Sequence, residues 1–181
     1  MTDTSGDFEY FSDGILDLEE YLLSKEIYWN LPGLPRLTIG NLLLTRIRLL
    51  NALNDLETLE KVRQLNIILD EVKSKWRAAW ENKIKAEIGS RIKLWSNYLA
   101  DYQSDPEEYY QAYSEEVRWR VIVELLSKEV SGNFKEKSLL KSLDGELQTV
   151  FIPGSFIWST RSSKDFPSDE FWFLYGRLHG R

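Results

Sequence analysis

The stretch LNALNDLETLEKVRQL, residues 50–65, places an aliphatic side chain at every third position. In one straight helix a step of three residues turns by about 300°, so a stripe with this spacing drifts almost all the way round the helix. A single partner surface cannot bury such a stripe. Asn54 is followed three residues later by Glu57, an arrangement typical of a capped helix start. The sequence therefore predicts one helix that ends near Ala52 and a second that begins near Asp55.

Helical periodicity recurs along most of the 181 residues, which predicts an all-α fold, a bundle of about five or six helices in a single domain 1–181. We expect a loosely ordered N-terminal segment at residues 1–12 and a first helix over 14–24. Pro32 and Pro35 then exclude a helix, so a connector joins this first helix to the next.

A long helix is expected after residue 55, because no proline follows until Pro106. Its apolar positions first alternate steps of three and four, as in a coiled-coil seam. From Trp76 onward they advance by four, which rotates the apolar surface around the axis. We therefore expect the helix to bend near Gly89 or to change its packing partner.

Capping signals divide the next part of the chain. Asp105 before Pro106 is typical of a helix start, and we expect this helix to continue to about Val130. Asn133 should cap a shorter helix that ends near Leu143, before a turn at residues 144–145.

The C-terminal segment, residues 149–181, is rich in aromatic residues and is expected to wrap around the bundle. Within it, TVFIPGSFIW (149–158) has apolar triplets on either side of Pro153 and Gly154. This pattern favours a short β-hairpin or an extended strand. Ser168 is suited to cap a last short helix. The sequence thus predicts an irregular, aromatic-rich tail.

The composition excludes several kinds of site. The chain has no cysteine, so disulfides, Cys-ligated metals and thiol nucleophiles are absent. Its acidic N-terminus lacks the pattern of a secretory signal, and no apolar run is long enough to cross a membrane. A cytoplasmic protein without membrane contact is the resulting expectation.

Residues suited to catalysis are sparse. The one histidine, His179, lies close to the C-terminus, whereas a catalytic histidine needs a rigid position and an orienting partner. No glycine-rich phosphate loop and no Glu-x-x-His motif occurs. Adjacent acids on a helix point about 100° apart, so they do not form a metal site by themselves. We expect no catalytic residue, no metal and no cofactor.

Charge is unevenly distributed, with net charges of −7, +5 and −4 over residues 1–30, 31–100 and 101–181. Internal complementarity between these segments is the simplest explanation. An anionic partner is the alternative, because basic residues attract phosphate. The bases of residues 73–102 are scattered around the helix, which does not favour this alternative. A nucleic-acid-binding protein would use Lys75, Lys85, Lys93, Arg36, Arg46 and Arg48.

A surplus of aromatic residues favours protein contact. The chain has seven Trp, nine Tyr and eight Phe, and residues 117–126 are apolar at nearly every angle of a helix. The aromatic tail or a partner chain must cover such a helix. We therefore predict a non-enzymatic interaction protein, a subunit or adaptor that binds a protein partner or itself. A small-ligand regulator or enzyme with an aromatic pocket is a further alternative. The predicted contact residues are Trp158, Phe171, Trp172 and Tyr175, followed by Trp76 and Trp80.

Overall fold

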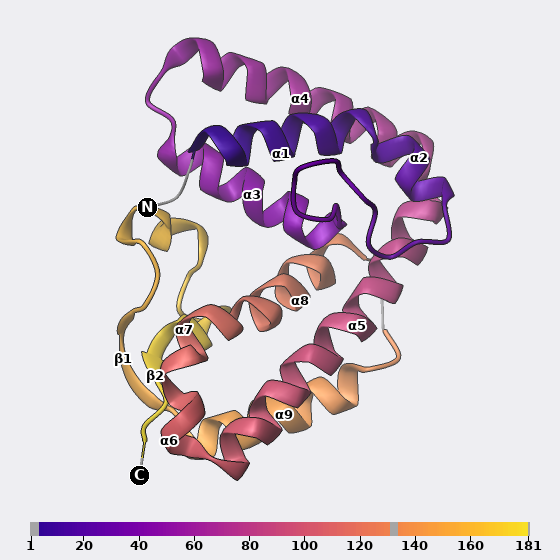
Figure 1. Cartoon of the computed structure of the whole chain (residues 1–181). Helices are drawn as coiled ribbons and strands as arrows, with labels where there is room; N and C mark the ends of the chain where they lie inside the picture. Colours follow the sequence, from indigo (N-terminus) through magenta and orange to yellow (C-terminus); the bar gives the residue numbers. More distant parts are fainter. Residues whose placement is uncertain (1–3, 131–133, 181) are drawn as a thin grey trace. The chain divides into compact units, whose positions relative to one another are not determined.

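The computed structural model describes residues 4–130 and 134–180 (Figure 1). Their regular secondary structure consists of α-helices, short 3-10 turns and one two-stranded sheet, joined by irregular connectors. The predicted all-α class is confirmed. Contacts divide the chain into two compact units, Met1–Glu87 and Ile88–Arg181. The helix α5 (Arg77–Ser104) contributes residues to both units. That the whole chain forms a single domain stays a prediction.

The first unit contains four further helices, of which α1 packs against both α3 and α4 (Figure 1). Their bounds are α1 (Thr4–Leu16), α2 (Leu18–Leu23), α3 (Ile39–Ala52) and α4 (Leu56–Lys75). The structure corrects the loosely ordered segment 1–12, because α1 already begins at Thr4. Tyr10 and Phe11 are buried and extend the apolar face of Ile15, so packing fixes this helix earlier than its glycines suggest.

The predicted chain break near residue 54 is confirmed. α3 ends at Ala52, and α4 starts at Leu56. The cap is Asp55 rather than Asn54: its carboxylate accepts hydrogen bonds from the backbone N–H groups of Glu57 and Thr58, at 3.4 and 2.8 Å.

A second interruption lies at Trp76, between α4 and α5, where one long helix was predicted. The backbone of Trp76 leaves the helical region, with φ −116° and ψ 38°. Its N–H still donates to the Val72 carbonyl at 2.9 Å, so the break is a local kink. The kink falls where the spacing of the apolar residues changes. The helix continues through Gly89, the predicted bend.

The connector between α2 and α3 is held by its own backbone. Trp29 and Leu37 exchange two hydrogen bonds, at 3.0 and 2.8 Å, across a turn in which Gly33 adopts φ 77°. Thr38 caps α3 by accepting from the Asn41 N–H at 3.1 Å. The connector therefore ends directly in a capped helix.

The second unit contains the rest of α5, then α6 (Pro106–Tyr109), the 3-10 turn η1 (Tyr110–Ala112), α7 (Tyr113–Glu116), α8 (Arg118–Glu129) and α9 (Lys137–Val150). Asp105 caps α6 as predicted, accepting from the Glu108 N–H at 3.2 Å. The single helix predicted over 106–130 is interrupted by η1 and again at Val117. The predicted cap at Asn133 lies outside the described residues.

The predicted turn at residues 144–145 is wrong. α9 continues through both residues to Val150, because Leu140, Leu143 and Leu147 keep one buried face across Gly145. A continuous apolar stripe thus outweighs the low helix propensity of a single exposed glycine.

The tail forms a strand, but not the predicted hairpin within 149–158. β1 (Ile152–Phe156) pairs antiparallel with β2 (Tyr175–Arg177), with Ile152 opposite Arg177 (Figure 1). Two 3-10 turns lie between them, η2 (Thr160–Asp165) and η3 (Trp172–Leu174). No helix follows Ser168 as predicted, and η3 and β2 take its place. Pro153 and Gly154 lie inside β1, which pairs with this distant segment rather than turning back on itself.

Candidate interaction surface

The tail aromatics that the sequence singled out form an internal cluster of the second unit. Phe166 is its centre: the ring is 1% exposed and lies 5.1 Å from the ring of Phe171 and 5.6 Å from that of Trp158. The Tyr175 hydroxyl donates to the Phe166 carbonyl at 2.8 Å. Sequence reasoning missed Phe166, because it lies in a segment that is otherwise polar.

The remaining bonds of these residues also point inward. The indole N–H of Trp158 donates to the Ser114 carbonyl at 2.8 Å, and Trp172 packs edge-on against Phe151 at 5.3 Å. Phe171 is fully buried, and Trp158, Trp172 and Tyr175 are half-buried. The structure thus brings the predicted tail residues together in one aromatic cluster, and their role in partner contact stays a prediction.

The two earlier tryptophans follow the same trend. Trp80 is fully buried, and Trp76 is half-buried at the kink between α4 and α5. The ammonium of Lys73 lies 5.5 Å from the Trp80 ring, and that of Lys75 lies 5.2 Å from the Trp76 ring. Trp80 is therefore closed to a partner, whereas part of Trp76 remains exposed.

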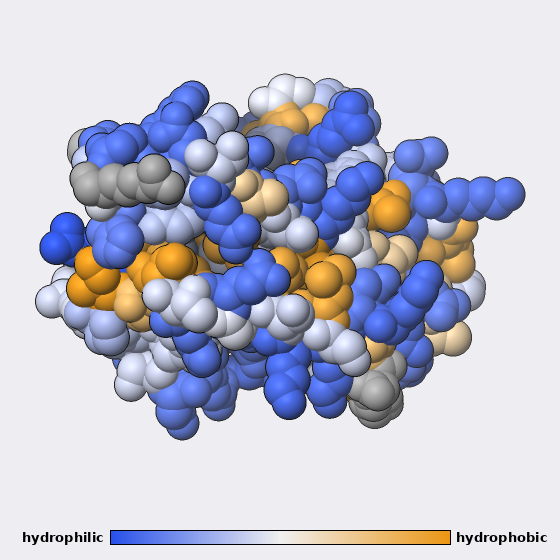
Figure 2. Space-filling view, turned by 90° about the horizontal axis from the view of Figure 1, so that it is seen from below, coloured by the Kyte–Doolittle hydropathy of each residue, from blue (hydrophilic) through white to orange (hydrophobic). Residues whose placement is uncertain are grey.

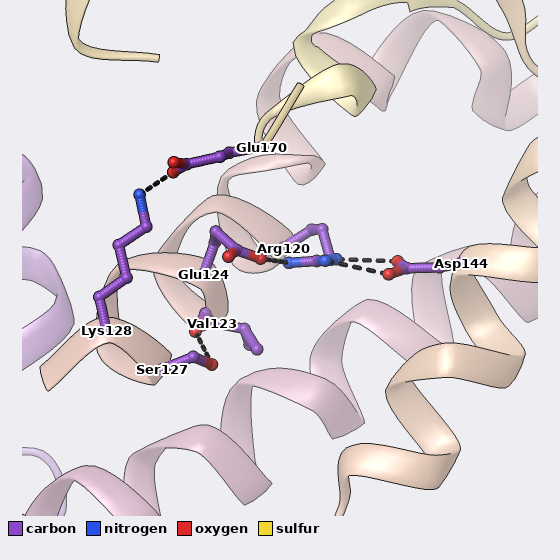
Figure 3. A network of polar contacts seen from close by, with 7 residues as sticks. All are labelled: Arg120, Val123, Glu124, Ser127, Lys128, Asp144 and Glu170. Atoms are coloured by element: carbon purple, nitrogen blue, oxygen red, sulfur yellow. Dashed lines mark hydrogen bonds and ion pairs between the residues drawn. The ribbon is translucent and has the colours of Figure 1, made fainter. Parts of the chain in front are cut away.

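A buried arginine clamps α8 to α9 (Figure 3). Arg120 is 5% exposed, and its guanidinium donates to both carboxylate oxygens of Asp144, at 2.8 and 2.9 Å. A third hydrogen bond goes to Glu124 at 2.9 Å, and the ring of Phe173 lies 4.5 Å away. Burial alone would lower the pKa of Arg120, but the hydrogen bonds and charge of Asp144 raise it overall. Such a pair fixes packing and leaves no group to act on a substrate.

Figure 3 also shows a second link from α8, the ion pair of Lys128 with Glu170. Both side chains are about half exposed, so this pair is screened by water and contributes little to stability. It ties α8 to the segment that precedes η3.

A shallow hollow beside α9 is lined by Lys137, Ser138, Leu140, Lys141 and Asp144. The Asp144 carboxylate of this hollow is already bound by Arg120, so Lys137 and Lys141 are its remaining charged groups. Within the described ranges no three or more His, Asp or Glu side chains are placed to hold a metal. His179 is exposed, and its carbonyl accepts from the Tyr102 hydroxyl at 3.0 Å, which docks the tail.

The basic residues of the nucleic-acid alternative are partly neutralised inside the first unit. Arg48 pairs with Asp7 at 2.8 Å, and Lys75 with Glu19 at 3.1 Å. The lysine lowers the pKa of the Glu19 carboxylate. The four remaining residues are exposed, apart from the half-buried Arg46: Arg36, Arg46, Lys85 and Lys93. Nucleic-acid binding stays a prediction.

Exposed aliphatic side chains concentrate in the first unit. Six of the eight strongly exposed large hydrophobic residues within 4–130 and 134–180 belong to it: Leu16, Leu23, Leu50, Leu56, Ile67 and Ile68. The other two are Leu94 and Leu139. Figure 2 shows that, on the face seen from below, hydrophobic residues reach the surface in separate patches between hydrophilic ones.

α4 exposes more of its apolar residues than it buries. Only Val62 and Leu69 are buried, although the helix carries aliphatic residues at eight positions. Leu56 is 82% exposed, Ile67 51% and Ile68 42%. The sequence already indicated this exposure, because Ile67 and Ile68 do not belong to the apolar positions of α4 that alternate steps of three and four.

α1 and α2 together present a second strip. The hydrogen bonds from the Asp17 N–H to Asp13 and from the Tyr21 N–H to Asp17, at 3.0 and 2.9 Å, carry the helical ladder across their junction. Residues on both helices therefore keep one helical spacing. On this spacing four exposed side chains share the face opposite the core: Glu9, Leu16, Glu20 and Leu23. We call this set the α1–α2 strip.

Comparison with known proteins gives no relative. No protein-family model matches the chain, and neither do the curated proteins or the solved structures. No helix within the described residues is both long and apolar enough to pass through a membrane. The surface of the chain is therefore the basis for the function proposed for it.

Proposed function

We propose that this chain is a non-enzymatic α-helical interaction protein, a subunit or adaptor that binds another polypeptide through its first unit. The observation that carries the proposal is the exposure of six large aliphatic side chains in that unit. Exposed large apolar side chains that gather on one part of a folded protein are typical of a contact site.

The predicted role of the tail residues changes with the structure. Phe171 is fully buried and Trp158 is held by Ser114, so both stabilise the second unit. The exposed residues of α4 and of the α1–α2 strip replace them as the proposed contact surface. Within residues 117–126, Val117, Val121 and Leu126 are fully buried in the chain itself, which removes one argument for a partner at the tail.

The energy available at α4 suits reversible association. Complete burial of a leucine or isoleucine side chain stabilises a complex by about 1.5–3 kcal/mol. Leu56, Ile67 and Ile68 could supply several such contributions, from which association costs are subtracted. Charged neighbours such as the Glu57–Lys61 pair, at 2.7 Å, would border the contact as a polar rim.

Affinity purification of the tagged chain from its native cells tests the proposal. We expect a protein partner to copurify with the wild type and to be lost from Ile67→Glu/Ile68→Glu or from Leu16→Glu/Leu23→Glu. Leu139→Glu is the matched control, because Leu139 is 48% exposed but belongs to the second unit. Circular dichroism checks that each variant is folded. A wild-type chain that purifies alone and scatters light as a monomer contradicts the proposal. That the assembly is cytosolic stays a prediction.

A further inference from the structure

We infer that the α1–α2 strip docks one basic amphipathic helix of a partner protein. This inference rests on the proposed function, and it adds the chemistry of the partner. Two properties of the strip carry it: a pair of exposed leucines at helix-docking spacing, and acidic side chains beside them that are not neutralised.

The leucines provide the apolar contact. Leu16 is 74% exposed and Leu23 is 54% exposed. They are seven residues apart, which places them on one face about 10 Å from each other along the axis. Apolar anchors at this interval are typical of one helix packed along another. More than half of each residue is therefore open to solvent.

The strip is held rigidly from behind. Phe11, Leu18 and Tyr21 are fully buried on the opposite face of α1 and α2. The ammonium of Lys83 donates to the carbonyl oxygens of Ser24 and Glu26, at 3.0 and 2.6 Å, and so fixes the chain after α2. A partner would therefore meet a preformed surface, which lowers the entropy cost of binding.

The acidic residues define the charge of the partner. Asp7 and Glu19 are neutralised by Arg48 and Lys75. In contrast, no ion pair within residues 4–130 and 134–180 involves Glu9 or Glu20, which are both exposed. Residues 1–30 carry a net charge of −7. Lysine or arginine beside the partner's apolar stripe complements this field.

The same charges disfavour other occupants. Phosphate-bearing partners are repelled by a surface that presents Glu9 and Glu20. A second copy that met this strip with its own strip would place like charges together. A strand would find no free backbone groups on a helix. A basic helix is the occupant that satisfies both the leucines and the acids.

Fluorescence anisotropy with a designed peptide tests the inference. The probe is a labelled amphipathic helix with leucines seven residues apart and lysines beside them, and its matched control carries glutamate in place of each lysine. We expect the lysine peptide to bind in the micromolar range and more weakly at about 300 mM than at about 50 mM salt. We expect the glutamate peptide to bind at least about tenfold more weakly.

Variants of the chain locate the binding site. Leu16→Glu/Leu23→Glu should weaken binding of the lysine peptide by at least about tenfold. Glu9→Gln/Glu20→Gln should weaken it several-fold and reduce its salt dependence. Ile67→Glu/Ile68→Glu on α4 and Leu139→Glu on α9 should leave its affinity unchanged, and circular dichroism confirms folding.

Three results with the peptides overturn the inference. The lysine peptide does not bind, or it binds Leu16→Glu/Leu23→Glu as well as wild type, or the glutamate peptide binds equally. A wild-type dimer that Leu16→Glu/Leu23→Glu dissociates also overturns it, since the occupant is then a second copy. Loss of the native partner only from the α4 variant leaves the proposed function intact while this inference fails. If the lysine peptide binds but no native partner copurifies, the strip binds a basic helix while the proposed function fails.

Discussion

Arg120 and Asp144 form a two-point ion pair, at 2.8 and 2.9 Å, that joins α8 to α9 within the second unit. The guanidinium is almost completely buried, and each of its contacts described above is a carboxylate or an aromatic ring. A buried charge is tolerated only while its partners remain. The pair therefore makes the packing of these two helices depend on one side chain.

Asp144→Asn should lower the free energy of unfolding by about 3 kcal/mol, because Arg120 then keeps one charged partner, Glu124. Urea denaturation measures the change. Lys61→Gln, which removes an exposed pair with Glu57, is the control and should have little effect. The double variant Arg120→Met/Asp144→Leu should recover much of the loss, since no buried charge remains. Equal stability of Asp144→Asn and wild type would show that the pair is not needed.

Two glycines should respond in opposite ways to alanine. Gly145 lies mid-helix in α9 with nothing within 4 Å of an added Cβ, so Gly145→Ala should stabilise the protein by about 0.5–1 kcal/mol. At Gly176 in β2 an added Cβ would overlap the Ile152 carbonyl and lie 2.5 Å from the Phe151 ring. Gly176→Ala should therefore destabilise by about 1–3 kcal/mol. Thermal unfolding of both variants checks the signs, and destabilisation by Gly145→Ala would contradict the course of α9.

Alkaline pH should destabilise the fold through two buried tyrosines. Burial raises the pKa of Tyr113 and of Tyr98, and the Tyr113 hydroxyl donates to the Phe173 carbonyl at 2.6 Å. Unfolded tyrosine ionises near pH 10, so above that pH the folded chain binds more protons than the unfolded chain. The contribution of these two tyrosines to the free energy of unfolding is therefore complete below about pH 10 and decreases as the pH rises further.

Denaturant titrations between about pH 8 and 11.5 measure this loss. In the variant Tyr98→Phe/Tyr113→Phe, the free energy of unfolding should decrease less steeply above about pH 10. At neutral pH this variant should be less stable than wild type by about 1 kcal/mol per lost hydrogen bond. Absorbance near 295 nm should show these two hydroxyls ionising only on unfolding. A variant that loses stability with pH as steeply as wild type would assign the effect to other groups.

The two faces of α4 should separate stability from binding. Leu69→Ala should cost about 2–4 kcal/mol, because Leu69 is 1% exposed. Ile67→Ala should change the free energy of unfolding by less than about 0.5 kcal/mol, because that side chain is 51% exposed. Parallel urea titrations compare them. If Ile67→Ala were as costly as Leu69→Ala, Ile67 would belong to the core and not to a contact surface.

Local signals in the sequence determined the all-α class, the break near residue 54 and the helix start at Asp105. These features follow from rules that act within a few residues: the period of apolar side chains and the capping of free N–H groups. A change in the spacing of the apolar side chains also indicated that the helix bends. The bend was nevertheless expected near Gly89, because a drifting apolar stripe can be accommodated at any of several turns.

Only the tertiary structure decided which aromatics are buried and which aliphatics are exposed. Phe166 becomes the centre of the tail cluster because Trp158, Phe171 and Tyr175 converge on it from separate segments. β1 finds its partner at Tyr175–Arg177, beyond two intervening turns. Burial and strand pairing depend on residues far apart in the chain, and periodicity carries no information about which of them will meet.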